Sequence, residues 1–410
     1  MILNYIWAGF FVVAFAVAAT TMLFTGSSEL FSQMVSATFD YAKLGFEISL
    51  GLAGVLSLWL GVMKIGERAG VVEFLARCSA PIFGRLFPEI PKNHPVVGGM
   101  FMNFSANLLG LDNAATPIGL NVMKQLQELN SGRDSASNSM IMFLVINASG
   151  LTLLPVTVMM YRAQAGAANP ADVFVPIMIA TAVSTITAII LTAVKQGINL
   201  LQKQLLLPGL ALLSLLAGVT YLFTTGDKET LSSGATSISN MLLMSVITAF
   251  IVVGLIKRIN IYESFISGAK DGFNTAVTII PYLVAILVSI GVFRASGAMD
   301  FLIDGVRYMV ESLGINSDFV GAIPTMLMKP LSGSGARGVM IDAMNTYGAD
   351  SFVGRLSCVL QGATDTTFYV VALYYGSVAV RRIRYTLSYS LIADAAGILT
   401  AIIVSYLFWS

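Results

Sequence analysis

Amide, hydroxyl and carboxylate side chains lie inside otherwise apolar sequence at four places, and these are the residues best able to do chemistry. The first segment carries Asn103, Asn107 and Asn113, together with Ser105 and Asp112. A buried amide or hydroxyl without a partner costs roughly 1–3 kcal/mol. Such a segment must satisfy its polar groups with one another, with water or with a solute. It therefore predicts either a solute-binding site or polar caps on broken helices.

Two apolar stretches carry polar side chains at corresponding positions near their middle. These are Asn147 and Ser149 in the first stretch, and Gln361, Thr364, Asp365 and Thr366 in the second. A carboxylate inside a membrane is a functional hypothesis by default, so Asp365 is expected to hold a cation, take up a proton or pair with Arg337. Neutral oxygens and freed carbonyls also suit a hard cation. The expected ligands of a coupling cation are Asn103, Asn147, Ser149 and Asp365.

The fourth polar segment is a glycine-rich turn that carries Ser332, Ser334 and Arg337. Its exposed backbone N–H groups could cradle an anionic or carbonyl group. Alternatively, the turn is a flexible tip whose Arg337 side chain reaches water. The sequence leaves both interpretations open.

The parts that an enzyme needs are missing, so we expect no catalytic activity and no resident cofactor. His94 is the single histidine, and Cys78 and Cys358 stand alone without metal-ligand spacing. No P-loop occurs, and Asp112 and Asp365 have amide-rich surroundings that disfavour an intramembrane aspartyl protease. With 23 basic against 22 acidic side chains and no basic stripe, nucleic acid is not an expected partner.

Composition indicates that most of the surface faces a lipid bilayer. Of all residues, 56% are apolar and 11% are charged, against roughly 25% charged in an ordinary soluble domain. Nine windows of about 19 residues are apolar enough to cross a hydrocarbon core of roughly 30 Å. The predicted spans are 2–24, 44–63, 138–161, 173–194, 205–223, 240–256, 276–293, 352–375 and 387–408.

Other stretches between these spans do not fit a crossing. Residues 71–83 and 299–313 have apolar side chains at helical spacing beside charges, which predicts helices along the membrane surface. Residues 95–111, with a return through Gln125, and residues 319–331, followed by the glycine-rich turn, are each shorter than the roughly 20 residues that a crossing needs. Backbone that turns at membrane depth must be buried in protein or reached by water, so both predict re-entrant hairpins.

Short motifs recur at a fixed separation, which predicts an internal repeat. The pattern AKxGF at 42–46 returns at 269–273, and GxxEFL at 70–75 returns at 297–302 with Asp for Glu, both 227 residues later. Four crossings per half plus one joining helix would invert the second half, a plan typical of secondary transporters. We therefore expect an all-α polytopic membrane protein of two inverted repeats. The predicted parts are 1–200, a linking helix at 201–236, and 237–410.

Basic side chains between the spans favour one orientation. With the N-terminus inside, fifteen Lys and Arg fall on the inner side and eight on the outer side and the second hairpin, where Arg162 and Arg294 are counted. The positive-inside rule then favours a C-terminus outside. Residues 2–24 could instead be a cleaved signal peptide, but no basic residue precedes the apolar run and the run is too long for one. We expect a retained anchor.

Longer motifs carry a resemblance to known families. The first half contains LFPEIPKNHP at 86–95 and NFSANLLGLDNAATP at 103–117, and it closely resembles spore maturation protein A. The second half contains KPLSGSGA at 329–336 and QGATDTT at 361–367, and it resembles spore maturation protein B. The resemblance covers nearly the whole chain apart from the joining helix. It implies the nucleoside recognition or "gate" group, which is similar to parts of concentrative nucleoside transporters and of ferrous iron transporter B.

These relatives imply paired hairpins and broken helices around a solute, in a bacterial cytoplasmic membrane. We therefore expect a secondary transporter or exporter of a small polar metabolite, with no cofactor except a coupling cation or proton. The alternatives are a non-transporting membrane scaffold for envelope or spore maturation, and a passive channel. Small-residue pairs are compatible with a homo-oligomer. The expected substrate-binding residues are Asn103, Asn107, Asn113, Asn147 and Ser149, facing Ser332, Ser334, Gln361, Thr364, Asp365 and Thr366.

Overall fold

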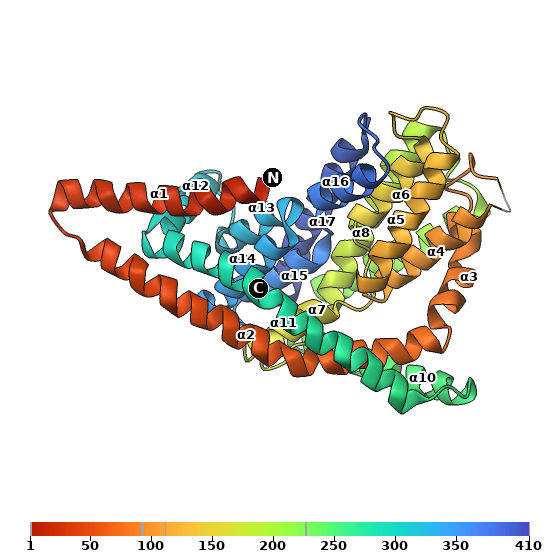
Figure 1. The fold of residues 1–410 in the computed structure, drawn as a ribbon, viewed down its shortest axis with the longest axis horizontal. Helices are drawn as coiled ribbons and strands as arrows, with labels where there is room; N and C mark the ends of the chain where they lie inside the picture. Colours follow the sequence, from red (N-terminus) through yellow and green to blue (C-terminus); the bar gives the residue numbers. More distant parts are fainter. Residues whose placement is uncertain (1, 92–93, 111, 226–227, 410) are drawn as a thin grey trace. The chain divides into compact units, whose positions relative to one another are not determined.

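The computed structural model describes residues 2–91, 94–110, 112–225 and 228–409, and some side chains within these ranges are not described. This part of the chain contains no β-strand, apart from an isolated bridge between Ser135 and Arg382. The predicted all-α fold class is confirmed (Figure 1). The helices are α1 (Ile2–Thr25), α2 (Glu29–Arg68), α3 (Val71–Phe83), α4 (Pro95–Leu108), α5 (Asp112–Glu128), α6 (Asn138–Ala148), α7 (Val156–Gln164), α8 (Phe174–Gln196), α9 (Lys203–Thr225), α10 (Lys228–Ile256), α11 (Ile261–Ala295), α12 (Ala298–Ser312), the 3-10 helix η1 (Asp318–Ala322), α13 (Ile323–Leu331), α14 (Gly333–Tyr347), α15 (Phe352–Ala363), α16 (Thr367–Ser377) and α17 (Thr386–Trp409).

Six helices in the described ranges are long and apolar enough to cross a membrane. They lie within α1, α2, α8, α10, α11 and α17, and each coincides with a predicted span. The predicted span at 205–223 coincides with α9, several of whose side chains are outside the described set. The chain is therefore a multi-pass membrane protein.

Two predicted spans, 138–161 and 352–375, are wrong as continuous helices. The first is divided between α6 and α7 by residues 149–155, and the second between α15 and α16 by residues 364–366. Gly150 leaves the helical conformation with φ +68° and starts the first interruption. Hydropathy averaged over a window does not register such a break, because the flanking residues stay apolar.

The described residues form two compact units, and we describe each by itself. Unit 1 comprises Met1–Leu60, Met160–Pro170 and Ala269–Gln361. Unit 2 comprises Gly61–Met159, Ala171–Gly268 and Gly362–Ser410. The units thus interleave the two halves of the sequence. The boundaries predicted at 200 and 237 concern sequence resemblance, and they stay predictions.

The order of helices from α2 to α8 returns from α11 to α17. Each series has a long helix, a short amphipathic helix, two short helices packed on each other, an interrupted helix and a last long helix. The packed pairs are α4 with α5 and α13 with α14, where the sequence predicts hairpins. Their depth in a membrane, and the inverted orientation of the second series, stay predictions.

Glycines set the distance between α2 and α11 in unit 1, where the two helices run side by side (Figure 1). The pairs Tyr41–Gly291 and Leu56–Gly272 show that the helices are antiparallel. A Cβ atom built on Gly272 would lie 2.5 Å from the carbonyl oxygen of Leu56. Close approach through small residues is typical of membrane helices, because it increases dispersion contacts and interhelical bonding. No methyl group fits at this position without backbone movement.

We predict that Gly272→Ala destabilises unit 1 by about 1–3 kcal/mol, because the added methyl meets backbone rather than a side chain that can rotate away. Gly54→Ala on α2 is the matched control, since nothing lies within 4 Å of a Cβ at that position. The control should be neutral or slightly stabilising through helix propensity. Thermal melting of the purified protein in detergent measures both, and equal melting temperatures for the two variants would contradict the packing argument.

Candidate functional site

The two interruptions, 149–155 and 364–366, and the end of α4 are joined by backbone hydrogen bonds in unit 2. The carbonyl of Leu108, at the end of α4, accepts a hydrogen bond of 2.8 Å from the N–H of Leu153. The carbonyl of Ala148, at the end of α6, accepts one of 2.9 Å from the N–H of Asp365. Helix ends leave such groups without intrahelical partners, and in a membrane each unsatisfied group is costly. The interruptions therefore satisfy one another.

Gly150 permits the backbone of one interruption to touch the backbone of the other. Its φ is +68°, and a Cβ atom would lie 2.6 Å from the amide nitrogen of Asp365 and 2.7 Å from the carbonyl carbon of Thr364. Gly110 is similar, with φ +71° and a Cβ position 2.9 Å from the Leu154 oxygen. Side chains with a Cβ rarely adopt this conformation, and here they would also collide with backbone. Gly150 therefore allows residues 364–366 to lie beside the end of α6, and Gly110 allows close approach to Leu154.

Asn103, Asn107 and Asn147 form a chain of amide hydrogen bonds that links α4, α5 and α6. Asn147 Nδ2 donates to the carbonyl of Phe143 at 2.8 Å, and Asn107 Nδ2 donates to Asn147 Oδ1 at 2.8 Å. Asn107 Nδ2 also lies 3.5 Å from Asn103 Oδ1, and Asn103 Nδ2 donates to the carbonyl of Ala115 at 2.8 Å. Asn103 is fully buried and Asn147 nearly so. Asn107 is half-buried and is the member of the chain most available to a solute.

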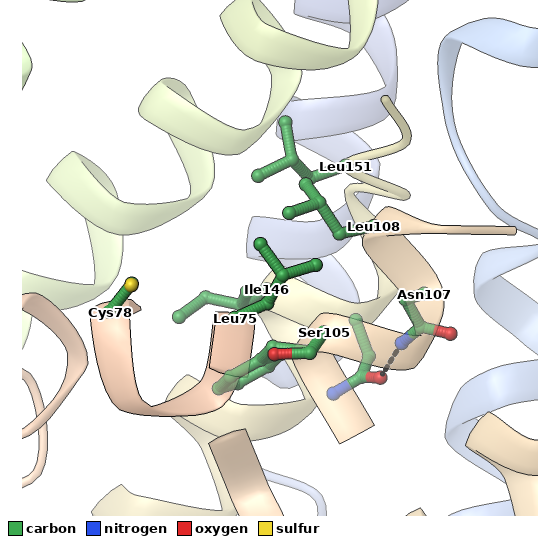
Figure 2. A pocket seen from close by; sticks show the side chains of 9 residues that line it. Leu75, Cys78, Ser105, Asn107, Leu108, Ile146 and Leu151 are labelled. Atoms are coloured by element: carbon green, nitrogen blue, oxygen red, sulfur yellow. Dashed lines mark hydrogen bonds between the residues drawn. The ribbon is translucent and has the colours of Figure 1, made fainter. Parts of the chain in front are cut away.

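A pocket of about 260 Å³ opens beside the amide chain. Figure 2 shows Cys78 on α3 at one end of this pocket and Ser105 and Asn107 on α4 at the other. Most of the lining is apolar, and hydroxyl and amide groups supply the polar contacts, which is the usual composition of a small-molecule site. The lining residues are Leu75, Cys78, Phe104, Ser105, Asn107, Leu108, Ile146, Asn147 and Leu151.

The remaining predicted residues of unit 2 differ in how accessible they are. Thr364 and Thr366 are buried, whereas the side chain of Asp365 between them is exposed and accepts a hydrogen bond of 2.6 Å from the Thr366 N–H. Ser149 is fully buried, and its hydroxyl bonds to the α6 backbone at 2.7 Å and to the Thr185 hydroxyl at 2.8 Å. Asp365 therefore carries the exposed charge of this group.

Three predicted residues belong to unit 1. Ser332 is the N-cap of α14, where its hydroxyl accepts a hydrogen bond of 3.1 Å from the Gly335 N–H and lies 3.3 Å from the Ser334 hydroxyl. Gln361 is half-buried, and its Oε1 accepts no hydrogen bond within the described part of the chain.

The side chain of Asn113 lies outside the described residues. Unit 2 thus brings together Asn103, Asn107, Asn147, Ser149, Thr364, Asp365 and Thr366.

Unit 1 also contains two ion pairs that sequence reasoning missed. The Arg294 guanidinium donates to the nearly buried Asp342 carboxylate, with a shortest distance of 2.6 Å, and the Tyr41 hydroxyl donates to the same carboxylate at 3.0 Å. Arg162 is fully buried and donates to Asp350 at 2.9 Å. In the sequence, both arginines have the pattern of loop charges. A lone carboxylate between Ile341 and Ala343 was the available signal for the first pair.

The described residues contain no group of three His, Cys, Asp or Glu side chains that could hold a metal ion. Of the expected cation ligands, Asn103, Asn147 and Ser149 are engaged in hydrogen bonds with the protein. Asp365 bonds through one carboxylate oxygen to the backbone. Cation coupling at these residues stays a prediction.

Comparisons with known proteins agree with the motifs. The family model described as "Nucleoside recognition" matches residues 49–164 and 276–381, more than half of the chain. Spore maturation protein B of Bacillus subtilis (strain 168) is 43% identical over 159 residues, which cover 39% of this chain and 88% of that protein. Spore maturation protein A of the same organism is 39% identical over 188 residues, which cover 46% of this chain and 92% of that protein. Similarity to most of both proteins is consistent with a fusion of the two.

We predict that Gly150→Ala disrupts the contact between the two interruptions. Forcing a Cβ into the left-handed region costs roughly 1–2 kcal/mol, and the collision with Asp365 and Thr364 adds to this cost. Gly166→Ala is the matched control, because Gly166 has φ +77° with nothing within 4 Å of a Cβ. Thermal melting should show the larger loss for Gly150→Ala, and equal losses would mean that the contact does not matter.

We also predict that the Cys78 thiol, which lines the pocket, reacts with a maleimide in the folded protein. Cys78 is exposed and lines the pocket, whereas Cys358 is fully buried. One thiol per chain should therefore react with a maleimide in the folded protein and two after denaturation, as counted by mass spectrometry. Labelling that persists in folded Cys78→Ser would contradict this assignment.

Proposed function

Because this chain belongs to the nucleoside recognition family, we propose that it is a membrane transporter, a secondary transporter or exporter, of a small polar metabolite. The observation that carries the proposal is the meeting of interrupted helices beside a pocket in unit 2, with buried amides on one side and an exposed carboxylate nearby. Interrupted helices at the solute site are a recurring plan of secondary transporters.

The pocket supports a solute that is partly apolar and partly hydrogen-bonding. Its apolar walls would pack against a flat or aliphatic part of the solute, and the half-buried Asn107 and the Ser105 hydroxyl would bind polar groups. Asp365 would bind a donor group of the solute or a cation. Asn103 and Asn147 would act mainly by fixing Asn107, since their amides are already bonded within the protein.

The proposal includes a location in the bacterial cytoplasmic membrane with the N-terminus inside and the C-terminus outside. The excess of basic side chains on one set of loops supports this orientation. The family description names nucleosides, which makes nucleosides the first class of solute to test.

We expect a solute to raise the melting temperature of the detergent-purified protein in a screen of nucleosides, amino acids, dicarboxylates, polyamines and ions. A ligand at a hundredfold excess over its Kd stabilises the folded state by about 2.7 kcal/mol. The same solute should slow the maleimide labelling of Cys78 and should cross liposomes that contain the protein. Asp365→Asn should reduce that flux at least about tenfold without lowering the melting temperature, because the side chain is exposed.

Asp304→Asn is the control for this experiment, since Asp304 is also exposed and pairs with Arg307 on α12. Flux that is unchanged in Asp365→Asn would remove this site from consideration. If no compound in the screen changes the melting temperature of the folded protein, and a stable protein partner appears in pull-downs, the membrane scaffold is favoured. Single-channel currents would favour a passive channel.

A further inference from the structure

Two turns of unit 2 are joined mainly through their backbones. They are the turn between α5 and α6 and the turn between α16 and α17. The N–H groups of Arg381 and Arg382 both donate to the carbonyl of Asp134, at 3.1 and 2.9 Å. The Arg384 guanidinium adds a hydrogen bond of 3.0 Å to the Ala136 carbonyl. The side chains of Arg381 and Arg382 are therefore not needed to hold this joint together.

The corresponding turns of the other series, after α7 and after α14, are joined in unit 1. There the fully buried Arg162 donates to the Ala349 carbonyl at 2.6 Å and to the Asp350 carboxylate at 2.9 Å. The Ala168 N–H donates to the other oxygen of that carboxylate at 2.8 Å, and Arg355 lies 3.8 Å from it. The arginines of this joint thus have a carboxylate partner.

Exposed basic side chains gather around the joint in unit 2. Gln196, at the end of α8, donates to the Asn138 carbonyl at 2.8 Å, and the Asn138 amide donates to Glu89 at 2.7 Å. Residues 85–91 and 192–199 therefore lie beside the two turns. Together with residues 127–138 and 378–389, they carry three acidic side chains, Glu89, Glu128 and Asp134, and six basic ones. The six basic side chains are all exposed and form what we call the basic surface: Arg85, Arg133, Lys195, Arg381, Arg382 and Arg384.

The basic surface lies where two membrane-crossing helices begin and end. α8 ends at Gln196 and α17 begins at Thr386, and both are long and apolar enough to cross a membrane. The rings of Tyr385 and Tyr389 lie 4.9 Å apart at the start of α17, and the Arg384 guanidinium lies 5.2 Å from the centre of the Tyr385 ring. Tyrosine is enriched at the membrane–water interface. These features indicate the level of the lipid headgroups.

We propose that the basic surface binds the phosphate groups of anionic phospholipids. Guanidinium groups suit phosphate because they offer paired N–H donors in one plane. The six basic side chains exceed the three carboxylates by three charges, which attracts an anionic leaflet. A free anion would meet the same charges, but a lipid also has tails. Ile190 and Val194, in the last turns of α8, are exposed apolar side chains that would contact those tails.

The lipid site goes beyond the proposed transport, because none of its six side chains lines the pocket or belongs to the amide chain. A phosphate that contacts Arg133 on one turn and Arg381 on the other would bridge the two turns. Binding of this kind favours the folded state, so it should be visible as a higher melting temperature.

The test is thermal melting of the full-length purified protein in detergent, with phosphatidylglycerol, phosphatidylcholine or inorganic phosphate added over the same concentration range. Phosphatidylglycerol should raise the melting temperature in a saturating manner, and the other two should raise it much less. Arg381→Gln combined with Arg382→Gln should increase the half-saturating concentration of phosphatidylglycerol at least about tenfold. In phosphatidylcholine this double variant should melt like the native protein, because the backbone N–H groups that join the turns are kept.

Lys43→Gln combined with Arg307→Gln is the matched control. It also removes two basic side chains, but each of them pairs with a carboxylate on its own helix. Its response to phosphatidylglycerol should equal that of the native protein. Arg133→Gln, on the other turn of the joint, should weaken the response.

Three results would overturn the lipid site. The first is equal melting in phosphatidylglycerol and phosphatidylcholine. The second is a phosphatidylglycerol response that both the Arg381/Arg382 double variant and Arg133→Gln retain unchanged. The third is stabilisation by inorganic phosphate equal to that by phosphatidylglycerol, which would mean an anion site that does not select lipid.

Discussion

The backbone groups freed where helices are interrupted are the constraint on which the rest of this structure depends. In a membrane, an N–H or C=O group without a partner costs several kcal/mol, and water is absent from the hydrocarbon region. Unit 2 meets this requirement because its interruptions lie next to each other. The Asp365 N–H donates to the Ala148 carbonyl, and the Leu153 N–H donates to the Leu108 carbonyl. Each interruption is stable because another one is adjacent. The site is therefore a product of backbone satisfaction before any side chain contributes.

Side chains refine what the backbone crossing sets up. Gly150 allows the close approach, and the amides of Asn103, Asn107 and Asn147 hold α4 and α5 against α6. An amide both donates and accepts, so a short chain of asparagines can join three helices without placing a net charge in the apolar interior. The same chain leaves Asn107 half-buried beside the pocket. The interaction that stabilises the packed pair thus also presents a polar group to a solute.

The sequence predicts most of the fold because apolar length and helical periodicity are local properties. The bounds of α3 and the positions of the long apolar helices follow from them, although α2 and α11 begin about 15 residues before the predicted spans 44–63 and 276–293. The break after Ala148 escapes prediction, because its cause is a contact between Gly150 and residues more than 200 positions away. For the site, the polar residues were visible as outliers in apolar sequence. Which of them are buried, as Ser149 is, or exposed, as Asp365 is, depends on tertiary packing.

Buried charge in this chain follows a related logic. The Asp342 carboxylate in unit 1 receives donors from Arg294 and Tyr41, so its charge is balanced within the protein. Asp350, also in unit 1, receives the guanidinium of the fully buried Arg162 at 2.9 Å. Removing one partner of a buried ion pair leaves an uncompensated charge, which costs about 3–5 kcal/mol. Each of these pairs therefore joins two segments of unit 1 that are far apart in the sequence.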